Sequence, residues 1–464
     1  MNTNDIDMMA KIKKDSNAKR VSDMDISEIE VLPEYSYVIK AVKEKYPAIF
    51  VTGKAGTGKS TFIRYTLENI LKSVVVAPTA IAAINVEGVT IHSFFSVPPR
   101  ILNDGETVSP KPVNIAILKQ LDVLIIDEIS MVGPDIIDCL DNTLKKLLDK
   151  TKPFGGLTII FVGDLFQLPP VVSGKAMKEY YSLNYKNQYF YSAKVFNQLP
   201  IKNVELTKVF RQTDSEFISA LDKIRINKDH RDAVALFNTK CYLEKQEYRM
   251  NSQEDLAETL TLVTINATAK AINDTKLNSL TTKESVFKAT YQGELLDSSM
   301  QFPVPDILRV KVGAKVIFRQ NKMPEWVNGS MGTVTKIDGK LIWVKIANTT
   351  REVQVDISSW DKIAYKYNRD SKKIESKVVG KFIQYPISLG WAVTIHKSQG
   401  MTLDAINIDL GRGAFCSGQV YVALSRCKTI ENITLLTPIS MADVKTDIDI
   451  VEFYEQLTIN SDLI

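Results

Sequence analysis

The sequence has few of the residues that build metal centres and disulfide frameworks. Its 464 residues include only four cysteines and three histidines. The cysteines stand far apart, with no Cys-x-x-Cys pair, which argues against a zinc site and against a disulfide framework and indicates a reducing cytosol. They are Cys139, Cys241, Cys416 and Cys427.

Long apolar runs are also lacking. No run approaches the roughly 18 residues that cross a bilayer. Residues 1–30 are polar and mixed in charge, without the apolar core of a signal peptide. We therefore expect a polar leader over 1–30, no signal, transit or transmembrane segment, and a location in the cytoplasm, or at the nucleoid if the chain is bacterial.

Neither sign of charge dominates, because 58 basic residues face 54 acidic ones and leave a net charge of +4. Affinity for nucleic acid would therefore require a local basic groove rather than an overall polycation. The length exceeds the roughly 250 to 300 residues at which a single core stops growing. The sequence thus predicts two large domains, and it contains no internal repeat or low-complexity tract.

Four short apolar runs in the first half predict strands buried on both faces of a parallel sheet. Each of them ends at a motif, and three of these motifs are the glycine-rich segment 53–60, Asp127-Glu128 and the Gly163-Asp164 turn. Because ligands collect at the carboxyl ends of such strands, we expect these motifs to share one crevice. The runs are Ala48–Thr52, Val74–Ala77, Val123–Ile126 and Leu157–Val162, with helices expected over Lys59–Leu71 and Pro134–Lys150.

The second half predicts another α/β unit, which begins near Phe190 and has no phosphate loop of its own. From about Lys283 to Tyr385 the pattern changes to short alternating runs with turn signals, which predicts a small inserted β-barrel. Ser96–Pro112 carries four prolines and a glycine and indicates a loop or hairpin insertion in the first unit. Strands of the second unit are expected at Thr261–Val263, Ile406–Leu410 and Ile433–Leu436.

The segment 53–60, Gly-Lys-Ala-Gly-Thr-Gly-Lys-Ser, matches the phosphate loop G-x-x-x-x-G-K-[ST]. In such a loop Lys59 neutralises the terminal phosphates and Ser60 ligates Mg²⁺, while glycines let backbone N–H groups approach the phosphates. The chain is therefore expected to use ATP and Mg²⁺. The expected nucleotide-binding residues here are Gly53, Ala55, Gly56, Thr57, Gly58, Lys59, Ser60 and Thr61.

Acidic and amide side chains follow the later strands. Asp127 and Glu128 come directly after an apolar run, as a Walker B pair does. Asp127 is expected to hold Mg²⁺ together with Ser60, and Glu128 to take the proton of the attacking water. Gln167, in the Gly163–Pro170 segment, is expected to contact the γ-phosphate and the water.

Two arginines lie in motif strings of the second unit: Arg211 in Val-Phe-Arg-Gln and Arg426 in Ala-Leu-Ser-Arg. They are expected to act as arginine fingers in cis. An arginine finger raises the rate of hydrolysis by about 10³ to 10⁵. Fingers supplied by the same chain are compatible with a working monomer.

The ordered strings together resemble the Pif1 helicases, in the Pif1/RecD-like branch of superfamily 1B, from about Val31 to the C-terminus. The resemblance implies an α/β fold of two RecA-like P-loop NTPase domains. Domain 1A would cover 31–188 with a strand-separating insertion 1B at about 96–112, domain 2A 189–282 and 386–464, and an SH3-like β-barrel 2B 283–385. The strings that carry it are Ala77–Asn85, Thr90–Phe95, Asp127–Val132, Phe154–Gly156, Gly163–Pro170, Thr394–Gly400 and Val422–Arg426.

The resemblance further implies ATP-dependent 5′ to 3′ movement on single-stranded DNA. Such enzymes unwind duplexes and forks and often G-quadruplexes or R-loops, in replication, repair, recombination or telomere and genome maintenance. Expected partners are single-stranded DNA and single-strand to duplex junctions. By resemblance Gly400 joins the nucleotide site and DNA is contacted by Thr79, His92, Phe94, His396 and Ser398, although the paired rings at Phe94 are equally typical of a core.

One departure concerns the base of the nucleotide. Helicases of this kind carry a glutamine shortly before the phosphate loop that reads adenine, and 21–50 contains none. We therefore consider stacking of the base on Tyr35 as a hypothesis. Two alternatives to a DNA helicase remain open at this point: a DNA- or RNA-stimulated translocase that displaces proteins, and an ATP-dependent DNA-binding switch that does not unwind.

Overall fold

The computed structural model describes residues 30–461 except 71, 80, 81, 84, 85, 87, 173, 247–258, 294–303, 321, 323, 324, 327–329, 348, 369–372 and 404. The expected leader, apart from its last residue, lies outside these residues. The described chain forms two compact units. The larger unit comprises residues 30–269, 364–377 and 393–461, and the smaller one Lys270–Ile363 and Val378–Ala392. No helix within the described ranges is long and apolar enough to cross a membrane.

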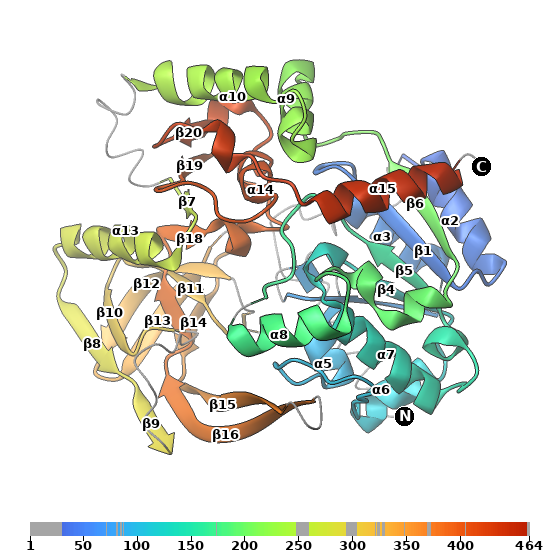
Figure 1. Cartoon of the computed structure of the whole chain (residues 1–464). Coiled ribbons are helices and arrows are strands. Elements are labelled where there is room, and N and C mark those ends of the chain that lie inside the picture. Colours follow the sequence, from blue (N-terminus) through green and yellow to red (C-terminus); the bar gives the residue numbers. More distant parts are fainter. Residues whose placement is uncertain are drawn as a thin grey trace. The chain divides into compact units, whose positions relative to one another are not determined.

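The larger unit contains a parallel sheet of six strands in the order β3-β2-β4-β5-β1-β6 (Figure 1). Non-consecutive neighbours in this order require helical crossovers, as in an α/β fold. The four predicted strands are confirmed to within one residue at each end. The strands are β1 (Ala48–Gly53), β2 (Ser73–Ala77), β3 (Val89–Thr90), β4 (Val123–Ile126), β5 (Thr158–Val162) and β6 (Ile201–Leu206).

This sheet is covered on both faces. Along β1, Ala48 and Phe50 face one buried core while Ile49 and Val51 face another. Helices α2 and α3 supply side chains to the second core, and α7 and α15 supply them to the first. Burial on both faces explains why the four inner strands are largely apolar, whereas the edge strand β6 also carries lysine, asparagine and glutamate. The helices of this half are α2 (Pro33–Lys43), α3 (Lys59–Asn69), α5 (Ile91–Phe95), α6 (Pro112–Leu118), α7 (Pro134–Leu147), α8 (Lys175–Asn184) and α15 (Ile448–Ser461).

Two segments correct the expected domain bounds. Strand β6 pairs with β1 in parallel, so the first sheet continues past residue 188. The C-terminal helix α15 returns to the first half, where Ile450 and Leu457 join its core. Neither fact is visible in sequence order, because pairing and packing partners are chosen in three dimensions.

A second parallel sheet, in the order β18-β7-β19-β20, follows later in the chain. Its β7 coincides with the predicted strand, and β19 and β20 each end one residue before theirs. The strands are β7 (Thr261–Val263), β18 (Ala392–Thr394), β19 (Ile406–Asp409) and β20 (Ile433–Leu435), and the helices are α9 (Ser215–Ile226), α10 (Arg231–Phe237), α13 (Asn266–Ser279) and α14 (Gln419–Leu424). Single turns of 3₁₀ helix include η3 (Ile129–Met131) and η8 (Ile395–Ser398).

The smaller unit is built from antiparallel strands, which confirms the β character predicted for this insertion. Its five-stranded sheet has the order β14-β13-β12-β11-β17. The run expected over Val310–Phe318 is broken at Gly313, whose φ of +91° suits glycine and turns the chain between β10 and β11. The strands are β8 (Glu284–Lys288), β9 (Thr290–Gly293), β10 (Ile307–Lys311), β11 (Lys315–Phe318), β12 (Met331–Asp338), β13 (Leu341–Ile346), β14 (Glu352–Val355) and β17 (Ile387–Leu389).

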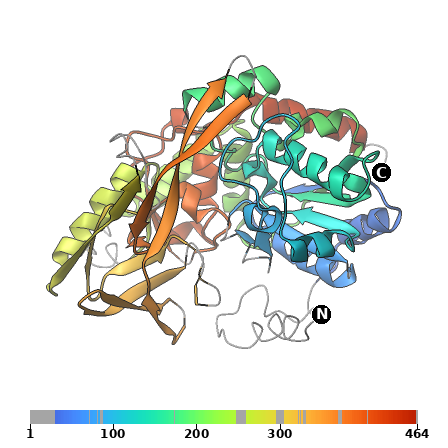
Figure 2. The ribbon, with the colours of Figure 1, turned by 90° about the horizontal axis from the view of Figure 1, so that it is seen from below.

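Strands β15 (Ser358–Asn368) and β16 (Lys373–Gln384), drawn in orange in Figure 2, form a three-stranded sheet with β9 in the order β15-β16-β9. The other predicted insertion, 96–112, contains no strand, and its only helical residue is Pro112 at the start of α6. It is a structured loop all the same. Arg100 forms an ion pair with Glu106 inside it, and the Leu102 N–H donates to Asp135 Oδ2 on α7 at 3.1 Å.

Candidate functional site

The phosphate loop lies between β1 and α3, as its sequence predicts. Gly56 and Gly58 adopt left-handed φ values of +85° and +82°, which glycine reaches without strain. Space is equally limited, because a Cβ on Gly56 would lie 2.6 Å from the Cβ of Arg211. The loop therefore needs glycine for its backbone and for the close approach of the second half of the chain.

Lys59 lies over the carbonyl groups of the loop. Its Nζ donates to Gly53 O at 2.6 Å and to Lys54 O at 2.8 Å. Burial lowers the pKa of Lys59, while Asp164 and Glu128 act in the opposite direction. The lysine is therefore held among the groups expected to take part in hydrolysis. Ser60 and Thr61 follow it in the first turn of α3 and are partly buried.

The expected Walker B pair stands at the end of β4. Asp127 is 7% exposed, and burial together with the neighbouring Glu128 raises its pKa to about 8. Glu128 has a left-handed φ of +48°, an uncommon conformation for a residue with a side chain. Its Oε2 accepts a hydrogen bond from Gln399 Nε2 at 3.1 Å. Gln399 also approaches Ser130 Oγ at 3.5 Å.

The two expected arginine fingers lie together beside the loop. Arg211 Nη1 donates to Ser425 O at 3.0 Å. Arg426 is 1% exposed and donates to the carbonyl oxygens of Val422 at 2.7 Å and Met401 at 3.1 Å. Burial and the charge of Arg211 lower the pKa of Arg426 to about 10. These guanidinium groups donate to backbone carbonyls and, for Arg426, to the Ser425 hydroxyl, which are neutral partners that phosphate oxygens can replace.

Gln167 lies in the turn that follows β5, and it is 4% exposed. Its N–H donates to Asp164 O at 3.0 Å, which closes the turn after β5. The second half approaches this turn closely, because a Cβ on Gly418 would lie 2.6 Å from Gln167 O. The turn is thus in contact with the start of α14. Gly400, the remaining expected nucleotide residue, has a left-handed φ of +79° just after η8.

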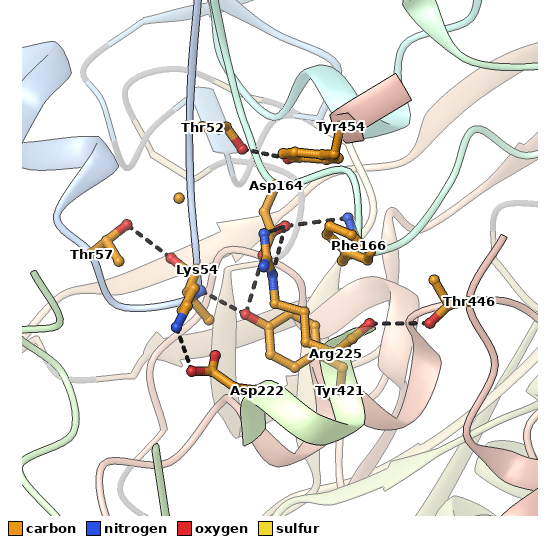
Figure 3. A network of polar contacts seen from close by, with 12 residues as sticks. Thr52, Lys54, Thr57, Asp164, Phe166, Asp222, Arg225, Tyr421, Thr446 and Tyr454 are labelled. Carbon is orange, nitrogen blue, oxygen red and sulfur yellow. Dashed lines mark hydrogen bonds and ion pairs between the residues drawn. The ribbon is translucent and has the colours of Figure 1, made fainter. Parts of the chain in front are cut away.

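A buried polar network, which sequence reasoning missed, joins these parts (Figure 3). Asp164 Oδ1 accepts from Arg225 Nη2 of α9 at 2.9 Å, and Asp164 Oδ2 accepts from Tyr421 Oη of α14 at 3.1 Å. The Ala55 N–H of the phosphate loop donates to Tyr421 Oη at 2.7 Å. Burial works against the charge on Asp164, but Arg225 and Lys59, with hydrogen bonds from Arg225 and the Phe166 N–H, together outweigh it and hold the pKa of Asp164 below its usual range. Asp164 and Tyr421 lie inside or beside motif strings, whereas nothing local in the sequence marks Arg225.

The structure overturns two of the expected DNA contacts. Phe94 is 6% exposed and packs in the first core with its ring edge-on to Phe95, so the core alternative for this pair is correct. Ser398 is fully buried, and its hydroxyl donates to Ile395 O at 2.8 Å inside η8. The Phe94 ring packs among apolar side chains of the core. The Ser398 hydroxyl stabilises its own 3₁₀ turn by donating to a backbone carbonyl.

The other three candidates are partly exposed. The Thr79 hydroxyl accepts from the Ala82 N–H at 3.2 Å and shapes its own turn. His92 lies in α5, and burial lowers its pKa. The ring of His396 stacks on Phe415 with 5.9 Å between centroids and 13° between planes, and burial lowers its pKa also. Phe415 is 57% exposed and escaped the sequence analysis.

The hypothesis that the base stacks on Tyr35 is wrong. The ring is 1% exposed and packs against Phe62 and Tyr65 of the second core, and burial raises its pKa to about 12. Phe210, in contrast, is 44% exposed. Its N–H donates to Gly56 O at 2.8 Å, and its ring lies within 3.4 Å of the position of a Cβ on Gly58. An exposed aromatic face therefore borders the phosphate loop.

The carboxylate of Asp127 and the hydroxyl of Ser60 suit Mg²⁺, which needs few protein ligands. Within the described part of the chain no three His, Cys, Asp or Glu side chains gather as a metal cluster. A buried carboxylate and a hydroxyl near a phosphate loop fit Mg²⁺, which takes one or two protein ligands and completes its shell with phosphates and water. Asp127 and Ser60, the expected ligands, are of these two types.

Together the fold and the site define a P-loop NTPase with two RecA-like parallel sheets. A family model described as PIF1-like helicase matches residues 33–233. The ATP-dependent DNA helicase Pif1 of Bdellovibrio bacteriovorus is 30% identical over 448 residues, which cover 93% of this chain and 93% of that protein. The chain therefore belongs to the Pif1 helicase family.

Other relatives agree in sequence and structure. The ATP-dependent DNA helicase PIF1 of Homo sapiens is 32% identical over 446 residues, which cover 91% of this chain but 63% of that protein. This chain thus spans less than two thirds of that relative's length. The crystal structure of a Bacteroides Pif1 bound to single-stranded DNA has a TM-score of 0.80 at 33% identity and covers 94% of this chain and 98% of that one. A Bacteroides Pif1 in complex with ADP-AlF3 and single-stranded DNA has a TM-score of 0.79 at 34% identity, with 93% and 98% covered.

Proposed function

We propose that this protein is an ATP-dependent DNA helicase that moves 5′ to 3′ on single-stranded DNA and separates duplexes. The observation that carries the proposal is the hydrogen bond between Gln399 and Glu128. Gln399 belongs to the same short segment as His396, a candidate DNA contact, whereas Glu128 lies beside the phosphate loop. A direct link between the two is what a motor needs in order to couple DNA binding to hydrolysis.

The side chains of the site divide the chemistry among them. Glu128, oriented by Gln399, takes the proton of the attacking water. Lys59, Arg211 and Arg426 bring positive charge to the phosphates as negative charge develops in the transition state. Ser60 and Asp127 would hold Mg²⁺, which supplies further charge neutralisation when bound.

Finer parts of the proposal concern DNA. The partly exposed residues Thr79, His92 and His396 contact the single strand, and the loop 96–112 acts as the pin that separates strands at a junction. Forks, G-quadruplexes and R-loops are the proposed substrates, in replication, repair, recombination or telomere maintenance. Both arginine fingers come from the same chain as the phosphate loop, which supports action as a monomer, although another neighbour is described as DNA unwinding at forked duplex by two coordinating Pif1 helicases.

The test is ATP-dependent strand separation on two partial duplexes, one with a 5′ single-stranded tail and one with a 3′ tail. We expect unwinding only from the 5′ tail. Unwinding from the 3′ tail alone would overturn the polarity. Absence of unwinding with DNA-stimulated hydrolysis intact would favour a translocase or a switch. Stronger stimulation of hydrolysis by RNA than by single-stranded DNA would indicate RNA as the substrate.

In Lys59→Ala, ATP turnover should be lost while DNA binding is retained.

A further inference from the structure

The hydroxyl of Tyr421 occupies an unusual position, between the phosphate loop and a buried ion pair. Tyr421 is 2% exposed and lies in α14, three residues before the last residue of that helix, Leu424. Its oxygen is 2.7 Å from the Ala55 nitrogen and 3.1 Å from Asp164 Oδ2 (Figure 3). It is thus the point at which the second half of the site touches a backbone amide of the phosphate loop.

The directions of these hydrogen bonds are fixed by their partners. Asp164 is ionised, because Arg225 contacts both of its oxygens, with Nε at 3.2 Å from each. An ionised carboxylate only accepts, so the Tyr421 proton points to Asp164. The lone pair of the hydroxyl is therefore left for the Ala55 N–H.

The Ala55 N–H belongs to the loop whose amides bind phosphate. An amide has a single proton, so it makes one well-aligned hydrogen bond at a time. A phosphate oxygen that takes this proton must displace the Tyr421 hydroxyl, which remains bound to Asp164. Phosphate and tyrosine therefore compete for one donor.

We propose that Tyr421 is a positioning residue that holds the phosphate loop through Ala55 and yields this amide to a nucleotide phosphate, so that nucleotide binding releases α14 from the loop. The inference rests on the proposed nucleotide binding and adds a mechanical consequence to it. The segment that follows α14 carries Ser425, whose carbonyl accepts from Arg211, and Arg426. Release of α14 would therefore free both fingers to turn toward the phosphates.

The loop is also tied to α9, which limits how far it can move during this exchange. Lys54 of the loop forms an ion pair with Asp222, and Arg225 lies three residues further along the same helix. The Arg225 guanidinium stacks over Phe166 at 4.3 Å from the ring centroid. Asp164 is thus held by Arg225, which is itself packed on Phe166. The Tyr421 hydroxyl is the part of the network that can lose one hydrogen-bond partner.

The experiment measures binding of ADP and of a non-hydrolysable ATP analogue, with Mg²⁺, to wild type and to Tyr421→Phe. Loss of the hydroxyl removes the competitor and leaves the Ala55 amide unpaired, which is costly for a buried donor, so we expect binding to tighten by about fivefold or more. Unchanged or weaker binding would overturn the inference. A tyrosine with only a structural role would lower stability without tightening nucleotide binding.

The matched control is Tyr454→Phe. Tyr454 belongs to the same network and donates or accepts a hydrogen bond with Thr52 Oγ1 at 2.5 Å, and its ring packs on Phe166 at 5.0 Å. Its hydroxyl pairs with Thr52, whereas the Ala55 amide donates to Tyr421. Its removal should lower stability and leave nucleotide affinity unchanged, and equal tightening in both variants would overturn the specific role of Tyr421.

A second measurement keeps the native hydroxyl, in case Tyr421→Phe fails to fold. Placing 3-fluorotyrosine at position 421 makes the ¹⁹F resonance a reporter of hydrogen bonding at the hydroxyl. The resonance should shift when the non-hydrolysable ATP analogue binds together with Mg²⁺. An unshifted resonance at saturation would overturn the inference. If wild type binds neither nucleotide, the proposed function itself fails, which the wild-type titration shows independently of either variant.

Discussion

The side-chain amide of Gln399 donates to the carboxylate of Glu128 across 271 positions of sequence, at a distance of 3.1 Å. Glu128 follows β4 of the first sheet, whereas Gln399 follows η8 beside the second. The other end of the Gln399 amide, Oε1, is buried and has no protein hydrogen-bond partner within the residues that the structure describes. It can therefore accept a hydrogen bond from a water positioned for attack, while Nε2 orients the base.

This relationship predicts the effect of changing Gln399. In Gln399→Ala the carboxylate of Glu128 loses its orienting donor, so kcat for ATP should fall by about 10² or less, a part of what a general base contributes. The KM for ATP should change little, because Gln399 orients the base rather than the nucleotide. Steady-state hydrolysis with saturating single-stranded DNA measures both.

Gln399→Glu is the sharper companion variant. It keeps the length of the side chain but opposes a second carboxylate to Glu128, and like charges this close disfavour ionisation of the base. We expect a larger loss of kcat than in Gln399→Ala, with partial recovery at higher pH. Equal activity of the two variants would contradict the orienting role.

Phe210 is predicted to contact the base of the nucleotide. Its exposed ring borders the phosphate loop, and stacking of a base on an aromatic ring is worth about 1 to 3 kcal/mol. Phe210→Ala should raise the KM for ATP accordingly, with a smaller change in kcat, and should leave inhibition by pyrophosphate unchanged because that probe has no base.

Phe415→Ala is the matched control, since it removes another exposed phenylalanine, the one that stacks on His396. Its KM for ATP should equal that of wild type. Tyr35→Ala should instead lower stability, since it empties a buried position among Phe62 and Tyr65. A raised KM in Tyr35→Ala at full stability would argue for the rejected tyrosine and against Phe210.

The buried ion pair of Asp164 and Arg225 is predicted to be costly to break. Both side chains are almost completely buried, at 0% and 6% side-chain exposure, so Arg225→Met leaves a buried carboxylate without its cation. The expected loss is about 3 to 5 kcal/mol in the free energy of unfolding. Urea denaturation of the variant and of wild type measures it.

Arg309→Met provides the comparison, because Arg309 also contacts its carboxylate partner Glu284 with two nitrogens but at 37% and 28% side-chain exposure. Solvent screening reduces such a pair to about 0 to 1 kcal/mol. Similar losses in the two variants would show that burial does not set the cost.

Histidine burial predicts a fall in stability at acidic pH. Burial, with a smaller contribution from Lys397, lowers the pKa of His396. The unfolded chain takes up this proton near pH 6.5 while the folded chain resists it, so stability is present above pH 6.5 and is lost below it, by at most about 1.4 kcal/mol per pH unit for one histidine. Burial lowers the pKa of His92 in the same direction.

The measurement is the urea midpoint of wild type and of His396→Asn between about pH 5.5 and 7.5. The wild-type midpoint should fall more steeply toward low pH, because the variant has lost one of the two partly buried histidine rings. Parallel profiles would contradict the role assigned to His396.

Local chemistry in the sequence determined most of the first sheet and the phosphate loop. Buried parallel strands must be continuously apolar, and a phosphate loop must have glycine where φ is positive, so both leave a signature within a few neighbouring residues. For this reason β1, β4 and β7 and the loop around Lys59 were predicted nearly residue by residue. The motif strings also named Arg211 and Arg426 as charges beside the loop.

Only the tertiary structure decided which residues from distant segments meet. Arg225 sits in an ordinary helix pattern, and its burial against Asp164 depends on the packing of α9. Tyr421, Gln399 and Phe210 acquire their contacts in the same way. The placement of β6 and α15 with the first sheet, and the burial of Phe94, Ser398 and Tyr35, follow from packing as well. A sequence records the preference of each residue for its neighbours along the chain, but burial and hydrogen-bond partners depend on elements that come together only when the whole chain folds.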